Sequence, residues 1–158
     1  MNGLVPERRL GHAGCLASDA FDLGEPDPLA ERYSCMIGHR TWVIPEGYIP
    51  GRSVSTAADL ISHETACILN ASDAKAAIEI TLYFESREPV GPFKLTVEPR
   101  RTRHLRFNDL EDPESVPRDT AYSSVIRSDV PIVVQHTRLD SRNPNIALLS
   151  TIAFPVHP

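Results

Sequence analysis

Alternation of apolar and polar side chains between positions 77 and 85 constrains the fold more than any other feature of the sequence. Every second position is apolar, and the residues concerned are Ile78, Ile80, Leu82 and Phe84. Successive side chains of a β-strand point to opposite faces of the sheet, so these residues share one face. The intervening positions carry small or polar side chains, including Glu79 and Thr81. The segment therefore predicts a β-strand that buries one face.

Similar segments recur along most of the chain. The other stretches that we predict to be strands are 41–45, 63–70, 93–97, 101–107, 123–127, 131–139 and 146–154. Turn-forming residues such as Pro89 and Gly91 separate them, and a long polar loop is expected at 108–119. We therefore predict an all-β fold for residues 39–158, an antiparallel and barrel-like β-sandwich of about seven or eight short strands.

Residues 1–38 differ from the rest because they show neither the period of strands nor that of helices. Acidic residues outnumber basic ones there by six to three, and glycine and proline are scattered through the segment. Such a composition buries little apolar surface, so we expect a flexible extension with one candidate helix at 28–35. The alternative is that the protein starts at Met36 and that the preceding residues are not expressed.

Composition and charge limit the classes of protein to which the chain can belong. Its 158 residues suit one domain, and its net charge of −5 gives no global attraction for a polyanion such as nucleic acid. No apolar run reaches the ~18 residues of a membrane span, and no apolar segment follows Arg8 and Arg9 to form a signal peptide. The three cysteines cannot all pair, so we expect a reducing cytoplasm, with Cys67 as a small buried side chain.

Recognisable catalytic motifs are absent from the sequence. There is no nucleophile elbow, no phosphate-binding P-loop and no dinucleotide-binding glycine motif. The stretch from His63 to Cys67 matches the HExxH metalloprotease motif only in part, because Cys67 replaces the second histidine and the context is a strand. A metal site joining His63, Glu64 and His136 across strands stays open as an alternative, but we expect neither a metal nor another cofactor.

One polar cluster follows an apolar stretch near the C-terminus. His136 and Arg138 continue the strand face that begins with Ile132 and Val134, so an apolar face becomes charged along its length. Either this face enters a cleft or a subunit interface, or Arg138 forms an ion pair with Asp140 that holds the following loop.

A second cluster is the basic stretch at 100–106, whose guanidinium groups suit planar oxyanions. We interpret Arg100 and Arg103 as a solvated strand face that is balanced by acidic residues nearby in the sequence. The stronger candidates share one face and are His104, Arg106 and Asn108.

Trp42 and Glu46 also share a predicted strand face. An aromatic ring beside a carboxylate can bind a sugar by stacking and by accepting hydroxyl hydrogen bonds. A lone tryptophan in a small β domain more often belongs to the core, so we assign Trp42 to the core and keep Glu46 as a candidate contact.

Several of these segments resemble the sensory rhodopsin transducer family. The matching stretches follow in the expected order and are 42–50, 63–70, 88–93, 106–110, 131–142 and 147–153. The most specific of them contains the run Gln135-His136-Thr137-Arg138-Leu139-Asp140-Ser141. The resemblance implies a small soluble β-sandwich protein that forms a homotetramer. It also implies coupling to the cytoplasmic side of a membrane photoreceptor, or binding of a sugar-like ligand.

The leading hypothesis is a non-enzymatic binding module in signal transduction that contacts a small polar ligand, a receptor, or both. The residues expected to make these contacts are Glu46, His63, Glu64, His104, Arg106, Asn108, His136, Arg138 and Asp140. One alternative is a hydrolase that uses His136 with Asp140 or Glu64 as acid and base. The other is a regulator that contacts DNA through the stretch from Arg100 to Arg106.

Overall fold

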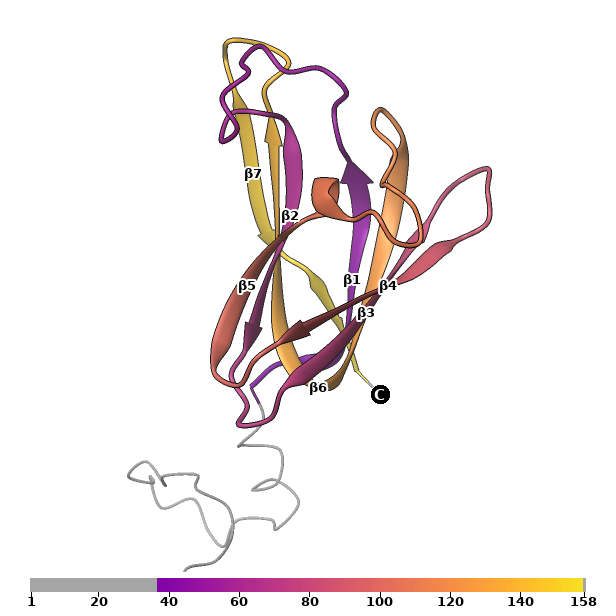
Figure 1. Ribbon diagram of the computed structural model, residues 1–158, viewed down its shortest axis with the longest axis vertical. Coiled ribbons are helices and arrows are strands. Elements are labelled where there is room, and N and C mark those ends of the chain that lie inside the picture. Colours follow the sequence, from indigo (N-terminus) through magenta and orange to yellow (C-terminus); the bar gives the residue numbers. More distant parts are fainter. Residues whose placement is uncertain (1–36, 158) are drawn as a thin grey trace, which may run out of the picture. The chain divides into compact units, whose positions relative to one another are not determined.

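The computed structural model describes residues 37–157, which form eight strands and one short 3₁₀ helix (Figure 1). The strands are β1 (His39–Tyr48), β2 (His63–Asn70), β3 (Ala76–Tyr83), β4 (Val90–Val97), β5 (Arg101–Arg106), β6 (Ala121–Asp140), β7 (Ala147–Ile152) and β8 (Phe154–Val156). The 3₁₀ helix η1 spans Phe107–Asp109. All of the strand pairs are antiparallel, so the predicted all-β class is confirmed.

Strand β6 belongs to both layers of the domain. Its first half pairs with β1 and β3 in the order β4-β3-β6-β1-β8, and its second half pairs with β2 and β7 in the order β5-β2-β6-β7. Figure 1 shows β6 turning at the lower end of the domain, so that its halves lie in different layers. The predicted sandwich is therefore confirmed. It is not closed into a barrel, because the edge strands β4 and β5 do not pair with each other.

The two strands predicted at 123–127 and 131–139 are one strand of 20 residues. That prediction was wrong because Pro131 lies inside β6 and does not open a new strand. Pairing with β3 ends at Ser128 and pairing with β2 begins at Val133, so Pro131 lies where β6 changes partners. A proline cannot donate a ladder hydrogen bond, and it is tolerated at a position where no ladder needs one.

The single strand predicted at 146–154 is divided at Ala153. β7 pairs with β6 and β8 pairs with β1, so the chain crosses from one layer to the other between them. Ala153 is buried, and its N–H donates to the carbonyl of Val134 at 3.0 Å. The apolar run continues through this crossing, so periodicity alone did not reveal it.

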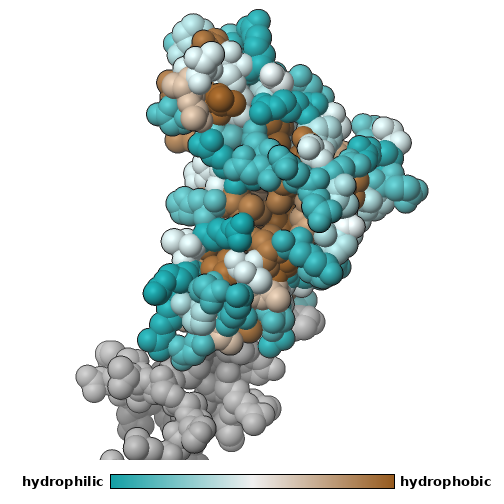
Figure 2. All heavy atoms as spheres, in the orientation of Figure 1, coloured by the Kyte–Doolittle hydropathy of each residue, from teal (hydrophilic) through white to brown (hydrophobic). Residues whose placement is uncertain are grey.

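The core lies between the layers and contains the alternate residues that the sequence predicted. On β3, the side chains of Ile78, Ile80 and Leu82 are all buried. Trp42 is buried too, and its indole N–H donates to the carbonyl of Ile132 at 2.9 Å, which confirms Trp42 as a core residue. Figure 2 shows apolar atoms along the middle of one face of the domain, flanked by hydrophilic side chains.

The predicted helix at 28–35 and nearly all of the predicted extension lie outside the described residues. Within the described part of the chain, no helix has the length and apolar character needed to cross a bilayer.

Candidate functional site

Glu64 is the centre of a buried polar network at one end of the core. Its side chain is only 1% exposed. The Oε1 atom accepts hydrogen bonds from Nε of Arg138 at 2.7 Å and from the N–H of Tyr48 at 3.0 Å, and Oε2 accepts from the hydroxyl of Tyr122. Nε2 of His136 lies 3.3 Å from Oε1. A buried carboxylate is costly without donors, and β1 and β6 supply them here.

These contacts decide the protonation of both partners. Burial raises the pKa of Glu64, but hydrogen bonds from His136, Tyr122, Tyr48 and Arg138 outweigh burial, so the pKa lies below its usual value. Burial and the neighbouring carboxylate raise the pKa of Tyr122 far above its ordinary range. Glu64 is therefore an ionised acceptor at neutral pH, and Tyr122 is a neutral donor.

Arg138 connects the buried carboxylate to the surface. Its Nη1 donates to Oε1 of Glu46 at 2.8 Å, while its Nε holds Glu64. The side chain of Arg138 is 17% exposed, whereas that of Glu46 is 71% exposed. Burial lowers the pKa of Arg138, but hydrogen bonds to the two carboxylates reverse this effect, and the pKa is raised. The charged guanidinium therefore bridges β1 and β2.

The strand register explains why these side chains meet. Glu64 lies directly opposite Arg138 in the ladder between β2 and β6, so the two side chains share one face. This face of β6 is buried at Ile132, Val134 and His136, and Arg138 is its half-buried continuation. The prediction that the face passes from apolar to charged along β6 is confirmed.

Asn108 supports the network from η1. Its Oδ1 accepts from the backbone N–H of Glu64 at 3.2 Å, and its Nδ2 donates to the carbonyl of Ser62 at 3.1 Å. The structure thus brings together five of the predicted contact residues, Glu46, Glu64, Asn108, His136 and Arg138.

Other predicted contact residues lie apart from this network. The Nδ1 atom of His63 is 2.7 Å from the carbonyl of Ile61, on the face of β2 opposite to Glu64. Nη1 of Arg106 donates to the carbonyl of Ala58 at 3.2 Å. Both side chains therefore hold the loop between β1 and β2.

The alternative ion pair between Arg138 and Asp140 does not form. Asp140 instead binds Arg142, whose Nε and Nη2 donate to its carboxylate at 3.0 and 2.6 Å. Arg138 is engaged by Glu64, which lies directly opposite it. Asp140 is consequently not the carboxylate beside His136, and Glu64 fills that position.

Tyr122 is the network residue that sequence reasoning missed. It lies just before the predicted strand at 123–127 and continues the buried alternation of Ser124 and Ile126. A buried tyrosine hydroxyl usually needs a hydrogen-bond partner, and this requirement was the available signal. The predicted strand began at residue 123, whereas β6 begins at Ala121, so the prediction did not include Tyr122.

The structure also shows the contacts of the alternative metal site and of the basic stretch. Within residues 37–157, no group of three or more potential metal ligands comes together, so the alternative metal site at His63, Glu64 and His136 does not form. In the basic stretch, Arg100 pairs with Asp73 at 2.6 Å rather than with the acidic residues closer in sequence, and Arg103 donates to a backbone carbonyl at 3.1 Å. Arg103 lies on β5, as the interpretation of an exposed strand face expected, whereas Arg100 lies in the turn before β5.

A small cleft of about 160 Å³ lies beside His136. Residues of β1, β6 and β7 line it, together with Ala153 between β7 and β8. Its polar lining residues are Glu46, His136 and Thr151, and its apolar ones are Ile44, Pro45, Leu149, Ile152 and Ala153. The cleft therefore lies directly beside the polar network, where Glu46 is exposed and His136 is almost completely buried.

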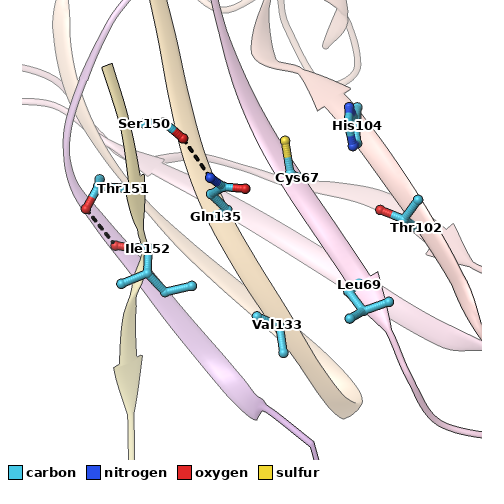
Figure 3. A pocket seen from close by; sticks show the side chains of 9 residues that line it. All are labelled: Cys67, Leu69, Thr102, His104, Val133, Gln135, Ser150, Thr151 and Ile152. Carbon is cyan, nitrogen blue, oxygen red and sulfur yellow. Dashed lines mark hydrogen bonds between the residues drawn. The ribbon is translucent and has the colours of Figure 1, made fainter. Parts of the chain in front are cut away.

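A wider groove of about 510 Å³ crosses the outer face of the layer formed by β5, β2, β6 and β7. Figure 3 shows Cys67, His104 and Gln135 on neighbouring strands of this groove, and Cys67 lies directly opposite His104 in the register. Gln135 donates to the hydroxyl of Ser150 at 2.6 Å. His104 is thus on the opposite face of the sheet from Glu64. Cys67 is half-buried in the groove, so the prediction that its side chain is buried was wrong.

The fold and the network together define a class of protein. Eight antiparallel strands form an open two-layer sandwich, and a carboxylate shared by both halves of β6 ties the layers together at one end. This is a small β-sandwich domain with a charged site at the end of its core.

The chain belongs to the Anabaena sensory rhodopsin transducer family, whose model matches residues 37–155. The resemblance inferred from the sequence is thereby confirmed. Among solved structures, the Anabaena sensory rhodopsin transducer is 56% identical, over 65% of this chain and 99% of its own, with a TM-score of 0.59. A second structure, Thermotoga maritima 1070, is 36% identical over 77% of this chain and 97% of its own, with a TM-score of 0.69. No curated protein matches the chain.

Proposed function

We propose that this protein is a signal-transduction module that binds a small polar ligand at the Glu64 network. Family membership supports the transducer role, since the solved relative at 56% identity is named a sensory rhodopsin transducer. The observation that carries ligand binding is the position of Arg138, which joins the buried Glu64 to the exposed Glu46 beside the cleft. A ligand that binds Glu46 competes with Arg138 for this carboxylate. It thereby changes the hydrogen bonds that Arg138 makes with the buried Glu64.

The network offers a physical route from the cleft to the rest of the fold. Tyr122 lies on the half of β6 that pairs with β1, whereas His136 and Arg138 lie on the half that pairs with β2. All three contact the Glu64 carboxylate. Because donors from both layers share this carboxylate, a change in its hydrogen bonds alters how the layers are held together.

We further propose that the protein acts in the cytoplasm as a homo-oligomer, the tetramer that the family resemblance implies, and that it contacts the cytoplasmic face of a membrane photoreceptor. The edge strands β7 and β8 support an assembly. Leu148 and Phe154 are each 68% exposed, and Ile152 is 59% exposed. Neighbouring exposed apolar side chains on edge strands are typical of subunit contacts.

Light scattering tests the assembly. We expect a mass that is a multiple of the 17.5 kDa chain, and a lower mass for Phe154→Asp. Tyr83→Asp is the matched control, because Tyr83 is an exposed aromatic residue on β3. A monomeric wild-type protein contradicts the proposal.

Isothermal titration calorimetry tests ligand binding against a panel of sugars, polyols, small anions and amines. For any ligand found, we expect Glu46→Gln and Arg138→Gln to weaken affinity by about ten-fold or more. Arg142→Gln is the control, because Arg142 forms an ion pair with Asp140 outside the network. Circular dichroism checks that each variant is folded. Unchanged affinity in both network variants removes this cluster from the site.

A hydrolase is the second candidate, because His136 is within hydrogen-bond reach of Glu64 and lines the cleft. A carboxylate that orients an imidazole is a common arrangement for a general base. However, Arg138 and Tyr122 also hold Glu64, and the one hydroxyl group among the cleft residues belongs to Thr151. Turnover of a panel of activated esters that disappears in His136→Gln favours the enzyme, and we propose no covalent chemistry for this site.

A further inference from the structure

The hydrogen bonds of His136 determine what its ring offers to the cleft. Glu64 can only accept, so Nε2 of His136 carries the proton that points to Oε1 at 3.3 Å. The guanidinium of Arg138 already balances the charge of Glu64. In an imidazole that carries its proton on Nε2, Nδ1 is an acceptor. Within residues 37–157, no group donates to it, and His136 lines the cleft.

Glu46 and Thr151 add further acceptors to the same cleft. Oε1 of Glu46 accepts from Arg138, whereas no residue in the described part of the chain donates to Oε2. The side chain of Glu46 is 71% exposed, so a ligand can reach this oxygen. The hydroxyl of Thr151 can accept as well as donate. Nη2 of Arg138 is enclosed by protein atoms and offers no donor to a ligand in the cleft.

The charges around the cleft favour a cation. Glu46 and Glu64 contribute two negative charges and Arg138 contributes one positive charge, which leaves one negative charge in excess. A carboxylate or phosphate ligand is repelled by this excess, and a cation is attracted. The burial of Glu64 and the partial burial of Arg138 reduce screening by salt.

The remaining lining selects the ligand by size and polarity. Ile44, Leu149 and Ala153 provide apolar walls, and the cleft of about 160 Å³ is smaller than the roughly 300–1,000 Å³ of pockets for drug-sized ligands. It therefore suits a short alkyl chain. An ammonium group carries three N–H donors, which match the acceptors of His136, Glu46 and Thr151. We propose that the cleft binds the ammonium group of a small aliphatic amine, an inference that names the ligand class of the proposed site.

Ligands of equal chain length test this proposal on the full-length protein. Titrations with n-butylamine, n-butanol and butyrate, followed by amide NMR shifts, separate charge from size. We expect butylamine to bind at least about ten-fold more tightly than butanol, and butyrate not to bind. The shifts are expected at β1 and β7 around the cleft.

Matched variants then separate the role of each acceptor. Glu46→Gln is expected to abolish the preference for butylamine over butanol. Glu79→Gln makes the same change at an exposed carboxylate on β3 and is expected to leave the preference intact. Thr151→Val is expected to weaken butylamine binding by a few-fold, since one of three acceptors is lost.

Binding of butanol or butyrate with equal or higher affinity overturns the ammonium assignment, as does a butylamine footprint in the groove around Cys67 and His104. In these cases the proposed function still stands if another member of the ligand panel binds and is weakened by Arg138→Gln. Absence of binding for every ligand in both experiments overturns the two proposals together.

Discussion

Strand β2 buries a polar side chain at each end, and the two residues are satisfied in different ways. Asn70 is fully buried, and its Nδ2 donates to the backbone carbonyls of Ala74, Val97 and Glu98. Glu64 is equally buried, but apart from one backbone N–H its donors are side chains 58 to 74 positions away. Asn70 therefore closes the turns at its own end of the sandwich, whereas Glu64 gathers titratable groups from distant segments.

The difference separates a structural polar residue from one that builds a site. Backbone carbonyls have no charge to redistribute, and the contacts of Asn70 leave no acceptor beside a cleft. The contacts of Glu64 include a guanidinium that reaches the exposed Glu46 and an imidazole that lines a cleft. Burial alone therefore does not identify a binding site, because the chemistry of the partners decides.

Replacement of Glu64 by alanine is expected to give the largest effect. It leaves the half-buried guanidinium of Arg138 without its main partner and the buried hydroxyl of Tyr122 without an acceptor. Loss of one member of a buried ion pair typically costs about 3–5 kcal/mol of unfolding free energy. Urea denaturation measures this loss. Glu79→Ala on β3 is the exposed control, and an equal loss in both variants contradicts a central role for Glu64.

Asn70→Ala is expected to destabilise the fold by about 1–3 kcal/mol, because buried carbonyls including that of Val97 lose their donor. Unlike the Glu64 variant, it should leave ligand affinity unchanged. Denaturation and calorimetry on the same variant check both expectations. A large change in affinity shows that the two ends of β2 are coupled.

The pH dependence of stability sharpens the same comparison. The pKa of Glu64 is lower in the folded protein than its usual value of about 4.3, so the ionised carboxylate favours folding. This contribution is fully present above that usual value and is lost as pH falls through the folded pKa. We expect the stability difference between wild type and Glu64→Gln to shrink below about pH 4. Asn70→Ala should show a difference that stays nearly constant, since amides do not titrate.

Glu46→Gln is expected to change stability least, by less than about 1 kcal/mol. Glu46 is 71% exposed, and water can replace its contact with Arg138. Thermal unfolding checks this expectation. A loss as large as that of Glu64→Ala shows that the exposed ion pair, rather than the buried one, holds the layers together.

Much of the site could be predicted because strand faces follow from local alternation. His136 and Arg138 were placed on the charged continuation of an apolar face, and the structure confirms that face. The partner of Arg138 could not be predicted in this way. Asp140 is two residues away in sequence, but the ladder places Glu64 directly opposite Arg138.

The sequence by itself determined the all-β class, most strand positions and the buried face of each clear strand, because the pleat repeats every two residues wherever the strand lies. Only the tertiary structure decided that β6 runs through Pro131 and that the last apolar run is divided between two layers. It also decided that Tyr122, His136 and Arg138 meet at Glu64. These outcomes depend on which strands pair and in which register. The local pattern of one segment does not show which other segment it pairs with.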